Sequence, residues 1–199
     1  KGLRTILIVV ALINFFSFIG IVLFLPLFES TASLGAGKYG IAMASFMAGA
    51  MAGFLFLSIV PVKPADKLKL FILSNVIFDI SIVIAVNQPI FILMVGFLVI
   101  TGFFNSVVNV ILISTVQAST PQELRGKVMA FISMTTAGLT PFAMAIGGVL
   151  GGFFPIRFVV SGAFLAVFFT TMPSYFSKPF KDYITCDYGE KGREESIES

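Results

Sequence analysis

The sequence predicts an all-α membrane protein with six spanning helices. Its 199 residues are 57% hydrophobic and only 12% charged, and the mean hydropathy is +1.02. In soluble domains about 25% of residues are charged. Here the charged residues stand in short clusters between long apolar stretches, and a helix needs about 20 apolar residues to cross a bilayer. The charge pattern therefore excludes a soluble core and divides the chain into spans.

The spans follow from the apolar stretches, taken in order along the chain. They are expected at residues 5–28, 39–62, 68–86, 90–117, 128–154 and 158–177. The third and fourth spans belong to one long apolar run whose single charged residue is Asp79. The turn-forming residues Asn87-Gln88-Pro89 divide this run into two spans. We expect one bundle over residues 1–177. Residues 178–199 carry mixed charges without a hydrophobic period, which predicts a disordered cytoplasmic tail.

The basic residues between the spans are distributed unevenly, and basic residues in short loops stay on the cytoplasmic side. One set of loops and ends holds Lys1, Arg4, Lys63, Lys67, Lys69, Arg125, Lys127, Lys178, Lys181, Lys191 and Arg193. The other set holds only Lys38 and Arg157. Both termini are therefore predicted to be cytoplasmic, in a multi-pass protein of the cell membrane whose surroundings are the lipid bilayer.

Several classes of function are disfavoured by what the sequence contains. It has no histidine, and its one cysteine, Cys186, lies in the tail, which disfavours His-based catalysis, His-ligated zinc and an internal disulfide. A membrane enzyme is also disfavoured, because the spans contain neither paired carboxylates nor a Ser-Lys arrangement. The net charge of +3 reflects membrane sidedness, so no nucleic-acid partner is expected. We predict neither enzymatic activity nor a metal or other cofactor.

Small residues recur at four-residue spacing in the second and fifth spans. Such stripes let helix backbones approach closely in a membrane, and tight packing alone explains many of them. They are Ser45, Gly49 and Gly53 beside Ala44, Ala48 and Ala52, and Ala143, Gly147 and Gly151 beside Gly148 and Gly152. Each stripe falls on the second member of a three-span group, as an inverted 3+3 repeat predicts. Pro141 removes a backbone hydrogen bond in the fifth span and favours a bend there.

Polar side chains form stripes in the first and fourth spans. Thr101, Asn105 and Asn109 recur every four residues and share one helical face, and Asn14 and Ser17 form a shorter stripe. An asparagine in hydrocarbon needs a polar partner, so these faces are expected to point inward. The pattern is compatible with a water-filled cavity and equally with dry bonds between helices.

Asp79 is the one charged residue deep within the apolar stretches, near mid-membrane in the third span. A carboxyl group is costly to ionise there, so Asp79 is a candidate for loading and releasing a proton during a transport cycle. Asn75, one turn earlier on the same face, can hydrogen-bond it. The alternative is a permanently protonated polar contact between helices.

The connection between the fourth and fifth spans has the pattern of a helix start. Thr120-Pro121-Gln122-Glu123 has the form of a capping box with proline at the first helical position. Arg125 and Lys127 follow on either side of Gly126 and anchor the fifth span in the cytoplasm.

The same connection carries a resemblance to a known family. The pattern Q-x-x-x-P-x-E-L-R-G-K-V runs from Gln117 to Val128 through Pro121, Glu123, Arg125, Gly126 and Lys127, and Gly-x-x-Pro follows at Gly138 to Pro141. Together with the six spans, it resembles the C-terminal half of a major facilitator superfamily transporter, most similar to bacterial macrolide-efflux and enterobactin-exporter permeases of the cytoplasmic membrane. The loop "PVKPADKLKL" lacks the gating motif of that family and keeps only its basic character.

The resemblance implies a half-transporter within a twelve-span protein that works by alternating access. It assigns a substrate cavity to Asn14, Ser17, Thr101, Asn105 and Asn109, and a half-to-half gating interface to Gly49, Gly53, Pro141, Gly147 and Gly151. It also makes the third and sixth spans peripheral, which leaves Asp79 a secondary candidate for coupling. The missing partner is the N-terminal half of the same natural chain or a second copy.

The sequence leads to two hypotheses about function. The first is proton-coupled export, by antiport, of an apolar or amphipathic small molecule such as a drug or a siderophore-like compound. The second is a six-span scaffold or channel-like subunit from a truncated transporter that works as a homodimer. The chain begins at Lys1 without an initiator methionine, so we expect a fragment of a longer protein.

Overall fold

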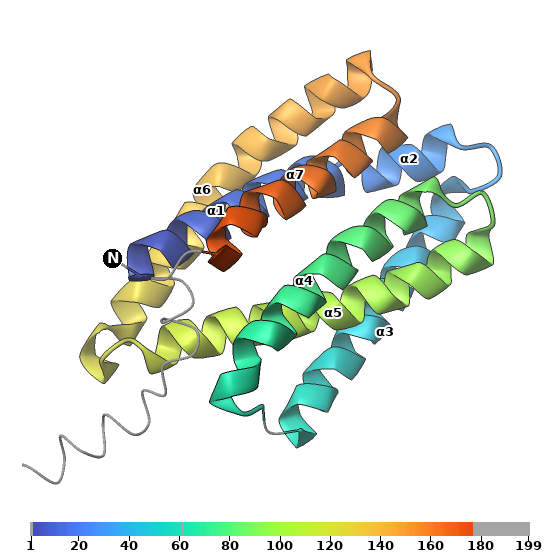
Figure 1. Cartoon of the computed structure of the whole chain (residues 1–199). Coiled ribbons are helices and arrows are strands. Elements are labelled where there is room, and N and C mark those ends of the chain that lie inside the picture. Colours follow the sequence, from blue (N-terminus) through green and yellow to red (C-terminus); the bar gives the residue numbers. More distant parts are fainter. Residues whose placement is uncertain (1, 61, 177–199) are drawn as a thin grey trace, which may run out of the picture.

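The computed structural model describes residues 2–60 and 62–176, and the predicted tail lies outside them. These residues form helices and no strands (Figure 1). The helices are α1 (Gly2–Ile21), α2 (Phe24–Ser30), α3 (Gly35–Ile59), α4 (Pro64–Asn87), α5 (Phe91–Ala118), α6 (Gln122–Phe153) and α7 (Ile156–Phe176). Within the described part of the chain, five segments are long and apolar enough to cross a membrane, and Ile156–Met172 of α7 is a shorter apolar helix. The all-helical membrane fold predicted from the sequence is confirmed.

The first span is broken where the sequence predicted one continuous helix. The break falls at Val22 and Leu23, between α1 and α2. Pro26 has no N–H to donate to the carbonyl of Val22 and its ring crowds that group, so the regular hydrogen-bond ladder cannot continue. The chain tightens instead, and the Leu23 amide donates to the Gly20 carbonyl at 3.2 Å.

The connections alternate between the two ends of the bundle (Figure 1). The α3–α4 and α5–α6 connections lie at the end where α1 starts and α7 ends, and the α2–α3, α4–α5 and α6–α7 connections lie at the opposite end. Lys63, Arg125 and Lys127 therefore share one end, whereas Lys38 and Arg157 belong to the other. This arrangement has the sidedness that the basic residues predicted, while the assignment of the basic end to the cytoplasm stays a prediction.

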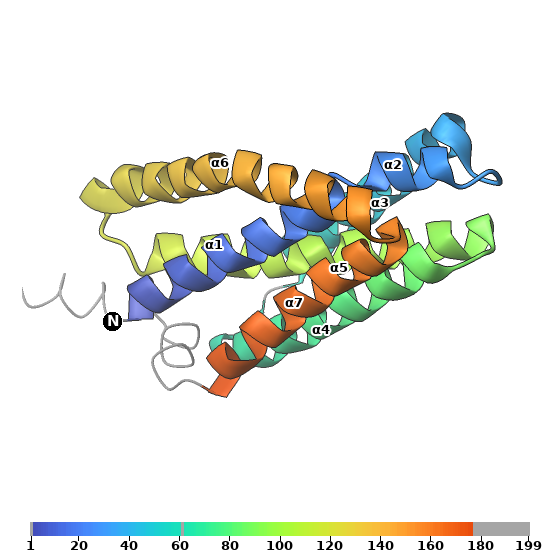
Figure 2. The same cartoon turned by 90° about the horizontal axis from the view of Figure 1, so that it is seen from above.

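Helix α5 packs against α3 and α4, while α1 packs against α6 and α7, and α4 also contacts α7. Figure 2 shows α6 along the edge of the bundle, beside α1. The α3–α5 pair is the closest, because Gly49 meets the backbone of Val99 and Gly102 meets the backbone of Phe46. The two helices are also joined by Ser106, whose Oγ donates to the Ala50 carbonyl at 2.8 Å.

The glycine stripes face helices of the same bundle. A Cβ on Gly53 would lie 2.5 Å from the carbonyl oxygen of Phe103 in α5, and one on Gly147 would lie 2.7 Å from that of Ile19 in α1. Gly151 likewise packs on the side chain of Leu23. These four glycines therefore make contacts within their own bundle. The half-to-half interface predicted for Gly49, Gly53, Gly147 and Gly151 stays a prediction.

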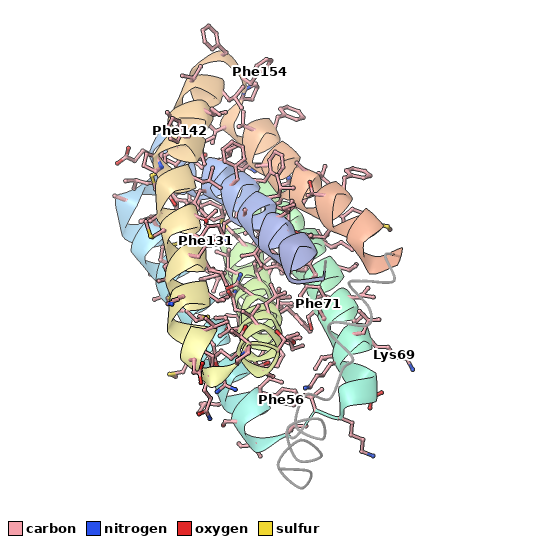
Figure 3. All side chains as sticks on the ribbon, turned by 90° about the vertical axis from the view of Figure 1, so that its left-hand side faces the viewer. Phe56, Lys69, Phe71, Phe131, Phe142 and Phe154 are labelled. Atoms are coloured by element: carbon pink, nitrogen blue, oxygen red, sulfur yellow. The ribbon has the colours of Figure 1, made fainter. Side chains whose placement is uncertain are left out.

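The rows of small residues one position round α3 and α6 from these glycines are exposed. Ala44, Ala48 and Ala52 are exposed on α3, and nothing lies within 4 Å of a Cβ placed on Gly148 or Gly152 of α6. Phe131 and Phe142, 56% and 68% exposed, also stand on α6 (Figure 3). Pro141 lies inside α6 without ending it and is exposed too, so its interface role stays a prediction.

The capping box predicted for the α5–α6 connection is wrong. Pro121 is the N-cap of α6, and no side chain caps the helix. The Thr120 hydroxyl donates instead to the Val116 carbonyl at 2.7 Å and satisfies an acceptor in the last turn of α5. Arg125 stabilises the connection because its Nε donates to the Thr120 carbonyl at 3.0 Å.

Candidate functional site

A cavity of about 690 Å³ lies between α1, α4, α5 and α6. Its volume falls within the range of about 300–1,000 Å³ that is typical of small-molecule sites. Most of the wall is apolar, with amides and hydroxyls set among aliphatic and aromatic side chains. The polar lining residues are Asn14, Ser17, Asn75, Asn105, Asn109, Ser133, Thr136 and Thr140. Such a wall suits a molecule that is mainly apolar and carries a few hydrogen-bonding groups.

The polar residues predicted for a cavity lie together, with one exception. Asn14 and Ser17 from α1 face the same space as Asn105 and Asn109 from α5. Thr101 does not line this cavity. It is fully buried, donates to the Phe97 carbonyl at 2.7 Å, and lines a neighbouring pocket of about 190 Å³. That these residues contact a substrate stays a prediction.

The hydrogen bonds separate the two interpretations of the polar stripes. Asn14 Nδ2 donates to the Val10 carbonyl at 2.8 Å, and Asn109 Nδ2 donates to the Asn105 carbonyl at 2.9 Å, so both amides bond within their own helices. Between α3 and α5 a hydrogen bond is made by Ser106, which the stripes did not include. Asn14 and Asn109 are therefore lining residues in this bundle and do not join helices through these bonds.

The smaller pocket adjoins the cavity towards the end that holds Tyr39. The two spaces share the wall residues Ser17, Ile21, Phe78 and Asn105. Beyond them the small pocket is lined by aromatic and methionine side chains, namely Phe24, Tyr39, Met43, Phe46, Met47 and Phe164. The larger space therefore carries the amide groups and the smaller one is mainly aromatic, and Ser17 and Asn105 stand on the wall of both.

Sequence reasoning missed part of the wall. Ser133, Thr136 and Thr140 of α6 line the cavity. Their spacing of three and four residues places three hydroxyls on one helical face, and this signal was available in the sequence. Asn75 and Phe78 of α4 also line the cavity, so the third span is less peripheral than the family resemblance implied.

Charge is absent from the described walls of both spaces, because neither lining includes Asp, Glu, Lys or Arg. Asp79 lies behind the wall, with 2% of its surface exposed. Over residues 2–60 and 62–176, no group of three His, Cys, Asp or Glu residues is placed to hold a metal ion. The described site can therefore bind through shape, apolar contact and neutral hydrogen bonds.

Comparison with known proteins gives one family. A comparison with curated proteins gave no match, and neither did a comparison with solved structures. The sequence profile of the Major Facilitator Superfamily matches residues 7–184, which is most of the chain. Members of this family are membrane transporters, and the helical bundle with its cavity agrees with that class. This chain belongs to the major facilitator superfamily.

Proposed function

We propose that this chain is the C-terminal half of a secondary transporter that exports an uncharged, apolar or amphipathic small molecule by alternating access. The observation that carries the proposal is the cavity of about 690 Å³. Its apolar walls hold the amides of Asn14, Asn105 and Asn109. Export from the cytoplasm in exchange for protons rests on the resemblance of the α5–α6 connection to bacterial drug and siderophore exporters.

The helix contacts support a 3+3 repeat within this half. One group is α1 with α2, α3 and α4, and the other is α5, α6 and α7. Exchanging the groups maps the contacts of α5 with α3 and α4 onto those of α1 with α6 and α7, while the α4–α7 contact maps onto itself. Such a repeat places a substrate site between the groups, where the cavity lies.

The proposal is tested by replacing the cavity amides with leucine. Asn105→Leu and Asn109→Leu keep the side-chain size approximately and remove a neutral hydrogen-bonding group from the wall. One such bond contributes about 0.5–1.5 kcal/mol, so we expect binding of a ligand that uses the amide to weaken about 2- to 10-fold. The measurement is fluorescence binding to the purified natural protein in nanodiscs, with the neutral dye N-phenyl-1-naphthylamine and the cationic dye ethidium.

Ser114→Leu is the matched control. Ser114 stands on the same helix, donates to the Ile111 carbonyl at 3.1 Å, and lies outside the cavity lining. The asparagine variants should alter the ratio of the two dye affinities while the control leaves it unchanged. Unaltered dye binding together with a lower protein yield in Asn105→Leu and Asn109→Leu would show that the amides serve packing alone. This outcome would contradict the proposed role of the cavity in binding substrate.

A further inference from the structure

A buried polar cluster joins α4 to α7 beside the cavity. Asn75 Nδ2 donates to Asp79 Oδ2 at 3.0 Å within α4, and the same nitrogen lies 3.2 Å from Thr171 Oγ1 of α7. The three residues are 1%, 2% and 0% exposed, respectively. Thr171 in turn donates its hydroxyl to the Phe168 carbonyl at 3.0 Å. One amide therefore connects a carboxyl group on one helix to a hydroxyl on another.

The second oxygen of the carboxyl group lacks a partner. Asp79 Oδ1 is buried and makes no hydrogen bond with the described residues. A carboxylate in hydrocarbon requires partners for both oxygens or a compensating charge, whereas a carboxylic acid does not. Enclosed in this way, the carboxyl group is therefore less costly as the neutral acid than as the carboxylate.

No described basic group compensates Asp79. Helix α4 packs against α5 and α7, and α5 contains no Asp, Glu, Lys, Arg, Cys or Tyr. Helix α7 contributes Arg157 in its first turn, about 21 Å of helix from Thr171, and Tyr175 in its last turn. On α4 itself, Asp66, Lys67 and Lys69 lie at the basic end, and Lys69 precedes Asp79 by about 15 Å of helix.

Asn75 connects this cluster to the cavity. It lines the cavity wall, whereas Asp79 does not. Asn75 is itself only 1% exposed, so water in the cavity reaches the carboxyl group only when the Asn75 side chain gives way. Phe78 stands on the same wall, adjacent in sequence to Asp79, and is shared by the cavity and the aromatic pocket. A change in the protonation of Asp79 can therefore affect both the cavity and the aromatic pocket through the neighbouring wall residues Asn75 and Phe78.

We propose that Asp79 is a proton-binding site whose state is transmitted to the cavity through Asn75 and to α7 through Thr171. In the release step a water molecule enters from the cavity past Asn75, the O–H bond of the Asp79 carboxylic acid breaks, and its electron pair stays on the carboxylate. The proton passes to that water molecule, which becomes hydronium. Uptake is the reverse. The Asn75 amide donates to Oδ2 in both states. In its coupling role the proposal rests on the proposed transport function.

The experiment detects the proton directly, without transport. The purified natural protein in lipid is taken through a pH change while infrared difference spectra are recorded, and the C=O stretching band of a carboxylic acid reports each group that gains or loses a proton. We expect one such band to be lost in Asp79→Asn and retained in Glu29→Gln, because Glu29 is an exposed carboxyl group at the end of α2. An unchanged set of bands in Asp79→Asn overturns the proposal.

Two further variants separate a proton site from a polar contact that merely holds the helices together. Asn75→Leu removes the donor to Oδ2, so the band should move to higher frequency. Thr171→Val removes the other partner of the same amide with little change in shape, so the band should move in the opposite direction as the Asn75 bond to Asp79 strengthens. These shifts also decide the matter if Asp79→Asn does not fold, and a band that neither variant moves overturns the proposal.

The link to the cavity has its own measurement. Binding of N-phenyl-1-naphthylamine should depend on pH in the natural protein and become independent of pH in Asp79→Asn, with Glu29→Gln behaving as the natural protein does. A dye affinity that responds to Asn109→Leu and keeps its pH dependence in Asp79→Asn sinks this inference while leaving the proposed transport function intact. If Asn105→Leu and Asn109→Leu leave dye binding unchanged while the infrared band of Asp79 is retained, the proposed transport function falls and the proton-binding site stands.

Discussion

Alanine at Gly49 or Gly102 should destabilise the protein by about 3 kcal/mol, the upper part of the range for overpacking a close-packed interior. A Cβ at either position would overlap backbone atoms of the partner helix, since Gly49 meets Val99 and Gly102 meets Phe46. Backbone cannot move aside as a flexible side chain can, so α3 and α5 must separate. The loss is measured as a lower melting temperature of the detergent-solubilised protein, followed by size-exclusion chromatography after heating.

Gly40→Ala and Gly96→Ala are the matched controls, one on each of the same two helices. Nothing lies within 4 Å of a Cβ placed at either position. Alanine is favoured over glycine in a helix interior by about 1 kcal/mol, so these variants should melt at the natural temperature or above it. A melting temperature for Gly49→Ala equal to that of Gly40→Ala would show that the close α3–α5 contact does not exist in the membrane.

Phenylalanine at Gly148 should abolish transport while leaving this bundle folded. Gly148 lies on the exposed row of α6, and no atom lies within 4 Å of a Cβ built there. Helix α6 is also the least buried of the five candidate spans. A row of small residues lets another helix pack closely against it. A phenylalanine ring at this position should therefore prevent the proposed N-terminal half from packing against α6. Transport of N-phenyl-1-naphthylamine in proteoliposomes should fall to the level of empty vesicles.

Gly162→Phe provides the comparison for this experiment. Gly162 is exposed on α7 and likewise has open space around a Cβ. The family resemblance makes α7 a peripheral helix, so a ring there should meet lipid and transport should continue. Equal transport by Gly148→Phe and Gly162→Phe would remove α6 from the interface. If a second copy of this chain occupies the surface, Gly148→Phe should instead convert a dimer to a monomer in light scattering.

The positions of the spans and the polar character of the cavity could be predicted from the sequence. A bilayer demands long apolar stretches, and length is a local property, so the predicted 90–117 and 128–154 correspond to Phe91–Ala118 and Gln122–Phe153. The four-residue spacing of Asn105 and Asn109 also fixes their common face, whichever helix lies opposite. The break at Val22 was less visible, although Pro26 gave a signal for it.

Only the tertiary structure decided which of two similar faces points inward. On α3, the Gly49 row and the Ala48 row are both small and both have four-residue spacing, and contact with the α5 backbone buries the first and leaves the second exposed. Asn75 lies 96 residues from Thr171 in the chain, so no local pattern could pair them. Helix formation in a membrane depends on the local chain, because each backbone group bonds within its own helix. Contacts between helices depend on complementary shapes that meet only when the bundle assembles.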